Sequence, residues 1–330
     1  MQRECGSELD LSFVVPVFNE AANIASFLQA LHVHVRSVAR FEVIFVDDGS
    51  TDDTAARIYQ SRTTVPFSVE LIGLSRNFGK EAALTAGLDH ARGRAVVPID
   101  VDLQHPPDVV DEMVALWRHG YDVVLPVRNQ RTERSALKRS SARAFYRLAN
   151  RIAESAIPEN AGDFRLMDAR VVDAVCRLRE RNRFMKGILS WPGFKVVQIG
   201  YDQAPRLHGE SKWRLSKLVR FALDGVFGFS TLPLRVWTYL GFGVSASAFV
   251  YLLVVLLQKL FVGIDVPGYA SLVSFILLFN GLTLIGIGIV GQYVGRVYNE
   301  VKGRPIYVVR ESTLRVGTAE VDPGEPHDAA

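Results

Sequence analysis

Apolar runs alternate with segments of helical periodicity over residues 11–125. The apolar runs predict five strands, at Leu11–Phe18, Phe41–Val46, Val69–Leu74, Ala95–Ile99 and Val123–Leu125. Between them, apolar side chains recur every three or four residues and predict helices, at Ala21–Val38, at Gly79–His90 and from Pro106 to Arg118. Strand–helix alternation with short connections predicts an α/β fold built on a mostly parallel sheet.

Two long segments near the carboxyl end of the chain hold no charged side chain. Val236–Leu257 has 22 residues and Ala270–Tyr293 has 24, and either can cross a hydrocarbon core of about 30 Å as a helix. Basic residues flank the pair on both sides, at Lys212, Arg214, Lys217, Arg220, Arg235, Arg296, Lys302, Arg304 and Arg310. By the positive-inside rule both flanks are cytoplasmic. We therefore predict a transmembrane hairpin in the inner, cytoplasmic membrane, with both chain termini in the cytoplasm.

These patterns divide the chain into four parts. They are a cytoplasmic α/β domain at 1–204, juxtamembrane amphipathic helices at 205–235, the transmembrane hairpin at 236–294 (spans about 236–257 and 270–293) and a cytoplasmic C-terminal tail at 295–330. Two stretches, 131–151 and 205–224, combine basic with aromatic and aliphatic side chains, which suits contact with an anionic membrane surface. The end of the tail, after Arg315, is predicted to be disordered.

The composition narrows the class of protein. Hydrophobic residues make up 48% of the chain and charged residues 22%, which excludes a disordered or coiled-coil protein as an overall description. The net charge of +3 gives no sign of a nucleic-acid partner. The two cysteines imply no disulfide framework, and the amino-terminal residues lack the apolar stretch of a cleavable signal peptide. The sequence contains no P-loop, dinucleotide-binding glycine pattern, zinc-protease pattern or serine-hydrolase elbow.

Polar side chains follow three of the predicted strands, at the point where each strand ends. Asn19-Glu20 follows the first strand, Asp47-Asp48 the second, and Asp100-Val101-Asp102 the fourth. Because ligands bind beyond the carboxyl ends of parallel strands, we expect these side chains to converge on one site. Carboxylate oxygens suit Mg²⁺ or Mn²⁺, which can also hold a substrate diphosphate, and Gln104 can supply a further oxygen.

Local structure offers an alternative interpretation of two of these clusters. Asp47-Asp48-Gly49 also suits a turn, with Ser50 or Thr51 capping the helix that follows. Glu20 also suits the first turn of a helix, where an acidic side chain is favourable. The two interpretations are compatible, because one side chain of a cluster can stabilise the turn or the helix end while another contacts a ligand. Three carboxylate clusters at the ends of three strands of one sheet favour a metal–nucleotide site.

Several segments together resemble glycosyltransferase family 2, which has the GT-A fold. The first of these segments are Val14–Glu20 (VVPVFNE), Val46–Asp52 (VDDGSTD) and Asp100–Pro107 (DVDLQHPP). Within the family, the chain is similar to the polyprenyl-phosphate group, more to bactoprenol glucosyltransferases than to dolichol-phosphate mannose synthases. That likeness lies in Ser75–Lys80 (SRNFGK), Gly162–Asp168 (GDFRLMD), Arg181–Gly187 (RNRFMKG), Gly209–Trp213 (GESKW) and Phe229–Arg235 (FSTLPLR).

The resemblance implies roles for individual residues. For donor binding it implies Pro16, Val17, Glu20, Asp47, Asp48, Lys80 and Asp100. For a Mg²⁺ or Mn²⁺ ion it implies Asp100, Asp102 and Gln104. For the acceptor phosphate it implies Arg128, Arg131, Arg206 and Lys212. For catalysis it implies Asp102, Asp163, Arg128 and Arg131, with Asp163 positioning the acceptor or acting as a weak base.

The resemblance also implies the reaction. The chain would be an enzyme that transfers a hexose, with glucose from UDP-glucose favoured, to undecaprenyl or a related polyprenyl phosphate at the cytoplasmic membrane face. A single displacement inverts the anomeric centre and gives a β-linked lipid phosphate. Mannose, N-acetylhexosamine and aminoarabinose donors are alternatives. A non-catalytic membrane adaptor of a lipid-flipping complex is another, although an adaptor has no need of the carboxylates. Glycines along the second span allow packing within the hairpin or against another copy.

Overall fold

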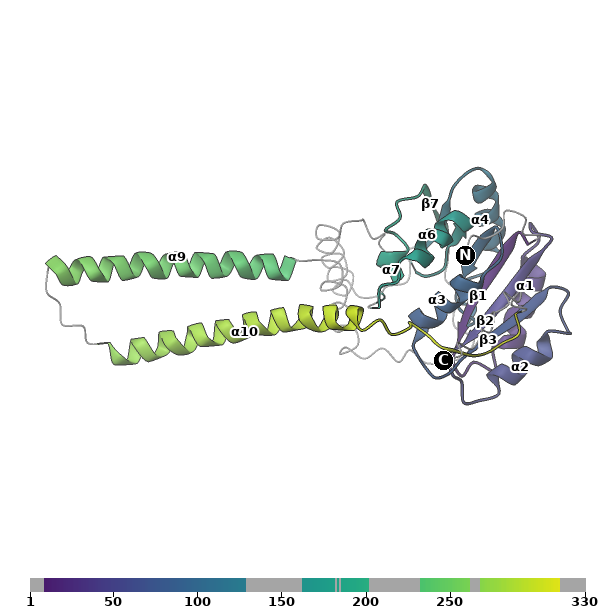
Figure 1. Ribbon diagram of the computed structural model, residues 1–330. Helices are drawn as coiled ribbons and strands as arrows, with labels where there is room; N and C mark the ends of the chain where they lie inside the picture. The colour runs from purple at the N-terminus through teal and green to yellow at the C-terminus, as the bar shows by residue number, and fades with distance from the viewer. Residues whose placement is uncertain are drawn as a thin grey trace, which may run out of the picture.

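The computed structural model describes residues 9–128, 162–181, 183, 185–201, 232–261 and 268–314. An α/β domain forms one end of the molecule, and two long helices extend from it (Figure 1). The amphipathic stretches predicted at 131–151 and 205–224 lie outside the described residues.

One mixed sheet forms the centre of the domain. Its strands are β1 (Leu11–Val17), β2 (Phe41–Asp47), β3 (Ser68–Leu74), β4 (Ala95–Pro98), β5 (Val123–Arg128), β6 (Leu166–Asp168), β7 (Val196–Tyr201) and β8 (Val309–Ser312). The order across the sheet is β7-β5-β6-β4-β1-β2-β3-β8. The neighbours among β1 to β4 pair in parallel, as do β5 and β7, whereas β6 and β8 pair antiparallel. This arrangement confirms the predicted α/β fold with a mostly parallel sheet.

Helices cover both faces of the sheet. They are α1 (Ile24–His34), α2 (Thr54–Ser61), α3 (Lys80–His90), α4 (Val109–Arg118), α6 (Ala169–Arg177) and α7 (Met185–Ile188). Successive side chains of a strand point to opposite faces. Phe13 and Val15 of β1 accordingly pack in one core with α1, α2 and α4, while Val14 packs in a second core with α3, α6 and α7. Burial on both faces is the reason that the central strands are largely apolar, with Ser12, Glu42 and Glu70 as polar residues near their amino ends.

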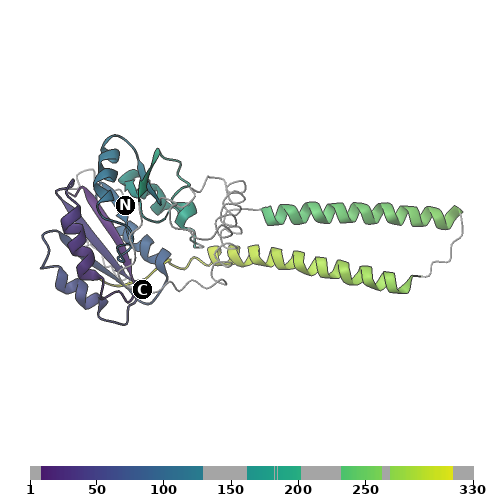
Figure 2. The ribbon, with the colours of Figure 1, turned by 180° about the vertical axis from the view of Figure 1, so that it is seen from behind.

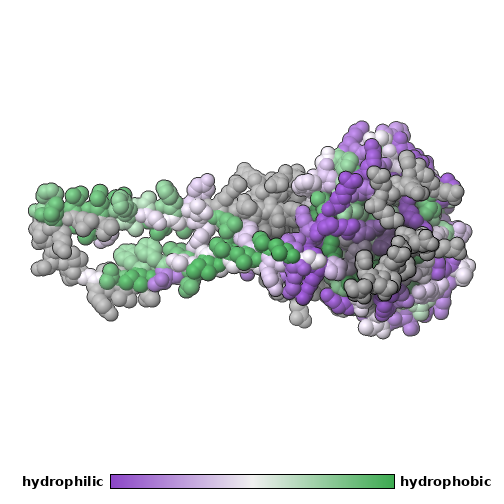
Figure 3. Space-filling view, in the orientation of Figure 1, coloured by the Kyte–Doolittle hydropathy of each residue, from purple (hydrophilic) through white to green (hydrophobic). Residues whose placement is uncertain are grey.

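The hairpin consists of α9 (Leu232–Phe261) and α10 (Tyr269–Val301). Both helices run side by side away from the sheet (Figure 1, Figure 2), and apolar residues dominate their visible surface (Figure 3). Val236–Val255 and Leu278–Val301 are long and apolar enough to cross a membrane. A side chain at Gly286 would place its Cβ 2.0 Å from the indole nitrogen of Trp237, so this glycine makes room for the contact between α9 and α10.

All five predicted strands are present, but the sequence prediction did not include β6, β7 or β8. β6 has only three residues, and β8 has the polar sequence VRES, so neither contains an apolar run that predicts a strand. The chain after α10 returns to the domain, where β8 pairs antiparallel with β3. The predicted helix from Pro106 begins at Val109 instead, because Pro106 and Pro107 supply the carbonyls of a preceding turn.

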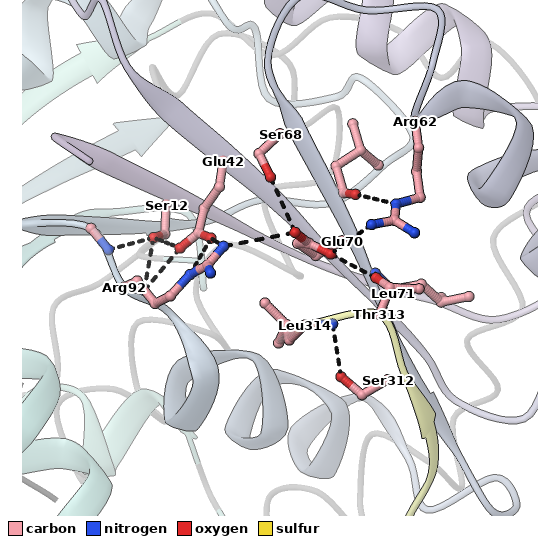
Figure 4. Close-up of polar contacts among 12 residues, drawn as sticks. Ser12, Glu42, Arg62, Ser68, Glu70, Leu71, Arg92, Ser312, Thr313 and Leu314 are labelled. Carbon is pink, nitrogen blue, oxygen red and sulfur yellow. Dashed lines mark hydrogen bonds and ion pairs between the residues drawn. The ribbon is translucent and has the colours of Figure 1, made fainter. Parts of the chain in front are cut away.

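A buried polar network lies at the amino ends of β1, β2 and β3 (Figure 4). The Glu42 carboxylate is fully buried. It accepts hydrogen bonds from the Ser12 hydroxyl at 2.6 Å and from the backbone N–H and the Nε of Arg92, both at 2.9 Å. Glu70 accepts a hydrogen bond from the Thr313 hydroxyl at 2.7 Å, which fastens the segment after β8 to β3. The network stabilises the edge of the sheet opposite the strand ends that carry the predicted site.

We expect Glu42→Ala to lower the free energy of unfolding by about 1–3 kcal/mol, the usual cost of leaving buried hydrogen-bonding groups without a partner, since the remaining Arg92 side chain is partly exposed. The change also leaves the Ser12 hydroxyl without its acceptor, and the Arg92 backbone N–H keeps only its longer hydrogen bond to Ser12 Oγ at 3.2 Å. Thermal unfolding of the full chain in detergent measures the effect. Glu112→Ala, at an exposed position of α4, is the control and should change stability by less than about 0.5 kcal/mol. Equal stability of the two variants would contradict a stabilising role for the network.

Candidate active site

The carboxyl ends of β1, β2 and β4 lie at one edge of the sheet, because these strands are neighbours and parallel. A pocket of about 230 Å³ opens there. Its lining residues are Pro16, Val17, Phe18, Glu20, Asp48, Lys80, Ala83, Asp100, Val101 and Asp102. The structure therefore brings together in one pocket all the residues predicted for donor binding except Asp47, and both carboxylates predicted to bind a metal.

The ammonium group of Lys80 joins two loops of this site. Its Nζ lies 2.7 Å from Asp100 Oδ1 and 3.0 Å from Asp163 Oδ2. Burial alone would lower the pKa of Lys80, but the charges and hydrogen bonds of the two carboxylates outweigh burial and raise it. Lys80 is therefore positively charged throughout the neutral pH range. It holds the loop after β4 against the segment that precedes β6.

Asp48 positions Lys80 by binding the backbone of the two residues that precede it. Its two carboxylate oxygens accept hydrogen bonds from the backbone N–H groups of Phe78 and Gly79, at 2.7 and 2.8 Å. Burial raises the pKa of Asp48, although these two hydrogen bonds oppose the rise. Gly79 has a φ of 99°, which a glycine adopts without steric cost. The start of α3 is thus fastened to the end of β2, and Lys80, its first residue, lines the pocket.

Asp47 forms a turn and does not line the pocket. Its Oδ1 accepts a hydrogen bond from the backbone N–H of Ser50 at 3.0 Å, as the alternative interpretation of this cluster predicts. The prediction that Ser50 or Thr51 caps the next helix is wrong, because α2 begins only at Thr54. The Ser50 hydroxyl instead accepts a hydrogen bond from the backbone N–H of Asn19 at 2.9 Å. This contact links the loops that follow β1 and β2.

Two non-glycine residues of the described chain have left-handed backbone conformations, and both lie next to the pocket. Asn19 has a φ of 56° and Leu103 a φ of 57°. Asparagine tolerates this conformation, whereas leucine pays a steric cost of roughly 1–2 kcal/mol. Such strain persists only where the surrounding structure enforces it, and it clusters at functional sites. Leu103 follows Asp102, so the strain lies in the loop that carries the predicted metal ligands.

Sequence reasoning missed a buried cluster of rings beside Asp100. His105 is buried, its Nδ1 lies 3.0 Å from the Tyr201 hydroxyl, and its ring stacks on Phe164 with 4.8 Å between the centroids. The other ring nitrogen, Nε2, lies 4.0 Å from Asp100 Oδ2. The cluster fixes the loop after β4 against β7. In the sequence, the only signal of a functional role is that His105 lies in the DVDLQHPP segment. No spacing rule relates the rings of His105, Phe164 and Tyr201.

Arg165 is a second buried residue that sequence reasoning missed. It is 2% exposed, and its Nη2 donates a hydrogen bond to the carbonyl of Gly162 at 2.9 Å. Burial lowers the pKa of Arg165 to about 10, against the opposing charge of Asp163. The guanidinium is therefore still charged at neutral pH and helps to hold the segment that carries Asp163.

Asp100 and Asp102 fit a divalent metal shared with a substrate diphosphate. Mg²⁺ commonly binds one or two protein carboxylates, with phosphate oxygens and water completing its coordination. Asp100 can contact Lys80 and a metal together, because a carboxylate offers about four lone-pair sites. Among the described residues, no group of three or more His, Cys, Asp or Glu side chains is arranged to hold a metal. The backbone N–H of Gln104 donates a hydrogen bond to Asp102 Oδ1 at 3.2 Å. Metal binding by the side chain of Gln104 stays a prediction.

The residues predicted for the acceptor phosphate fall at or beyond the limit of the described chain. Arg128 is the last residue of β5, at the carboxyl edge of the sheet. Arg131, Arg206 and Lys212 lie outside the described residues. Their roles stay predictions.

Comparison with known proteins identifies a family model and several proteins that are similar to this chain. The family model described as glycosyl transferase family 2 matches residues 12–176. A prophage-derived bactoprenol glucosyl transferase of Shigella flexneri is 45% identical over 312 residues, which cover 92% of this chain and 98% of that protein. An uncharacterised glycosyltransferase of Synechocystis is 46% identical over 307 residues, with 92% and 95% covered. The solved glucosyl-3-phosphoglycerate synthase of Mycobacterium tuberculosis, in complex with Mn²⁺ and UDP-glucose, is 19% identical, with 66% and 76% covered and a TM-score of 0.42.

Proposed function

Because the chain belongs to glycosyl transferase family 2 and is a glycosyltransferase with the GT-A fold, we propose that it transfers glucose from UDP-glucose to a polyprenyl phosphate. The transfer takes place at the cytoplasmic face of the membrane and inverts the anomeric centre. Similarity to a bactoprenol glucosyl transferase along 92% of the chain supports the sugar and the acceptor. The two helices able to cross a membrane support the location. The observation that carries the proposal is the contact of Lys80 with both Asp100 and Asp163 in the pocket that Asp102 also lines.

The pocket offers the contacts that a nucleoside diphosphate sugar needs. Pro16 and Val17 supply an apolar wall for the nucleotide, and Glu20 supplies an acceptor for its polar groups. Lys80 brings a fixed positive charge to the diphosphate. A divalent metal, held by Asp100 and Asp102, would offset the negative charge that develops on the departing UDP.

The acceptor requires orientation more than deprotonation. A phosphate monoester has its second pKa near 6, so at neutral pH one of its oxygens can attack the anomeric carbon directly. The new carbon–oxygen bond forms as the bond to UDP breaks, and UDP leaves with that electron pair. Asp163 takes no proton, and it positions the acceptor indirectly, because it holds the Lys80 ammonium at 3.0 Å and this ammonium attracts the phosphate. The rate then depends on alignment and on stabilisation of charge.

A transfer assay with a panel of donors tests the proposal. The full chain in detergent receives undecaprenyl phosphate, Mn²⁺ and labelled UDP-glucose, UDP-N-acetylglucosamine, GDP-mannose or a nucleotide aminoarabinose. Label from UDP-glucose should enter the organic phase, and a chelator should abolish it. The other donors should react at about a tenth of that rate or less. Lipid label from one of the other donors alone would correct the sugar and keep the mechanism. The absence of lipid label from every donor would contradict the proposed reaction and favour the adaptor.

A further inference from the structure

A second pocket lies where α10 meets the α/β domain. It has a volume of about 590 Å³ and is formed by the last turns of α10, by the residues that follow α10, and by Arg181 in the loop between α6 and α7. Among the described residues that line it, four have basic side chains, namely Arg181, Arg296, Lys302 and Arg304, and one has an acidic side chain, Glu300. These side chains give this part of the pocket a net positive charge, and no described residue lines both this pocket and the one at the strand ends.

Three acceptor groups at this pocket have hydrogen-bond partners, namely the Glu300 carboxylate and the carbonyls of Tyr298 and Glu300. Glu300 Oε1 accepts a hydrogen bond from the backbone N–H of Arg181 at 2.8 Å, which joins α10 to the loop. At the end of α10, the backbone N–H of Lys302 bonds the carbonyl of Tyr298 at 3.0 Å, and that of Gly303 bonds the carbonyl of Glu300 at 3.3 Å. Free carbonyls at a helix end would oppose an anion. These hydrogen bonds reduce that opposition, and the four basic side chains outnumber the single carboxylate of Glu300, so the pocket favours an anion.

The pocket also lies at one end of a segment that is able to cross a membrane. Leu278–Val301 is that segment, and the pocket extends from Gly291 to Arg304. Trp191, which follows α7, is 52% exposed, and α7 lies at the end of the domain that faces the hairpin (Figure 1, Figure 2). Exposed tryptophan and basic side chains are typical of the headgroup layer of a bilayer. Lipid headgroups are thus the nearest source of anions for this pocket.

We propose that this pocket binds the phosphate of an anionic phospholipid, such as phosphatidylglycerol, and so holds the catalytic domain at the membrane surface. The proposal rests on the membrane location given in the proposed function. The planar guanidinium groups of Arg181, Arg296 and Arg304 match the oxygens of a phosphate, and basic pockets beside membrane helices on the cytoplasmic side bind lipid headgroups. The occupant is a phospholipid and not the polyprenyl phosphate, because the phosphate of the acceptor has to reach the sugar in the pocket lined by Lys80 and Asp100.

The test measures how much lipid is retained by the full chain in detergent when phosphatidylglycerol, phosphatidylcholine or undecaprenyl phosphate is added. Near anionic lipid, each basic side chain contributes a factor of about five to binding. Arg296→Gln/Arg304→Gln should therefore retain about 25-fold less phosphatidylglycerol and the same amount of phosphatidylcholine. The single variant Arg304→Gln, at an exposed position, should show about a fivefold loss, so the result does not depend on folding of the double variant. Arg57→Gln/Arg118→Gln, which removes two exposed arginines outside the pocket, should retain lipid as the wild type does.

Equal retention of phosphatidylglycerol by the wild type and by the Arg304 variants would overturn the proposal. A loss of undecaprenyl phosphate in place of phosphatidylglycerol would overturn it as well, since the pocket would then belong to the acceptor. Glucosyl transfer is measured on the same samples. Its absence from the wild type would contradict the proposed function alone, because lipid retention does not require catalysis.

Discussion

Asp102→Asn is expected to lower the rate of glucosyl transfer by about 10²–10³-fold, the usual cost of removing one fixed group that stabilises charge in a transition state. Asp102 lines the pocket beside Asp100, and an amide is a weaker ligand than a carboxylate for a hard divalent ion. The amide oxygen can still accept the hydrogen bond that Asp102 Oδ1 accepts from the backbone of Gln104. The loop should therefore keep its shape. The measurement is kcat for transfer from labelled UDP-glucose, with thermal unfolding recorded beside it.

Asp108→Asn is the matched control, because Asp108 is exposed in the same segment and its side chain makes no capping hydrogen bond to α4. We expect it to change the rate by less than about twofold. Raising the Mn²⁺ concentration should restore part of the lost activity of Asp102→Asn and leave Asp108→Asn unaffected. Full activity of Asp102→Asn at low Mn²⁺ concentration would contradict the assignment of Asp102 to the metal.

Lys80→Met is expected to lower the rate of transfer by about 10²-fold or more. The ammonium group lies between Asp100 and Asp163, and without it two carboxylates repel each other across the site. The diphosphate of the donor also loses a positive charge. Lys80→Arg should recover part of the rate, because a guanidinium can contact both carboxylates. Lys195→Met is the control, since Lys195 is an exposed lysine that lies over the Tyr121 ring.

The pH dependence of the rate distinguishes a permanently charged Lys80 from a titrating one. Because Asp100 and Asp163 raise the pKa of Lys80, its ammonium stays protonated until the pH exceeds the ordinary lysine value of 10.5. Between pH 6 and 9, the rate of the wild type should depend on pH in the same way as the rate of Lys80→Arg. A fall in the wild-type rate above pH 8 that is absent from Lys80→Arg would show that Lys80 loses its proton in this range.

The central strands and the carboxylates of the site could be predicted from the sequence for one physical reason. In a parallel sheet the central strands are buried on both faces, so β1, β2 and β4 are apolar over most of their length and are soon followed by polar residues. The same parallel arrangement places Glu20, Asp48 and Asp100 around one pocket. The apolar composition of α9 and α10 predicts long helices with equal clarity.

Contacts between distant segments could not be predicted in the same way. β8 is four residues long, and its pairing with β3 depends on α10 returning the chain to the sheet. The contact of Lys80 with Asp163 joins residues far apart in sequence, as does that of His105 with Tyr201. No periodicity relates such pairs, because the sheet order that brings them together is a property of the whole fold.

The configuration of the product tests the central claim most directly. The lipid formed from UDP-glucose and undecaprenyl phosphate is isolated, and its anomeric proton is examined by nuclear magnetic resonance. A single displacement by the phosphate oxygen, aligned in the pocket of Lys80, Asp100 and Asp102, predicts a glucosyl phosphate that is entirely β-linked. An α-linked product would contradict direct displacement, and a lipid without a glucosyl phosphate linkage would contradict the proposed reaction itself.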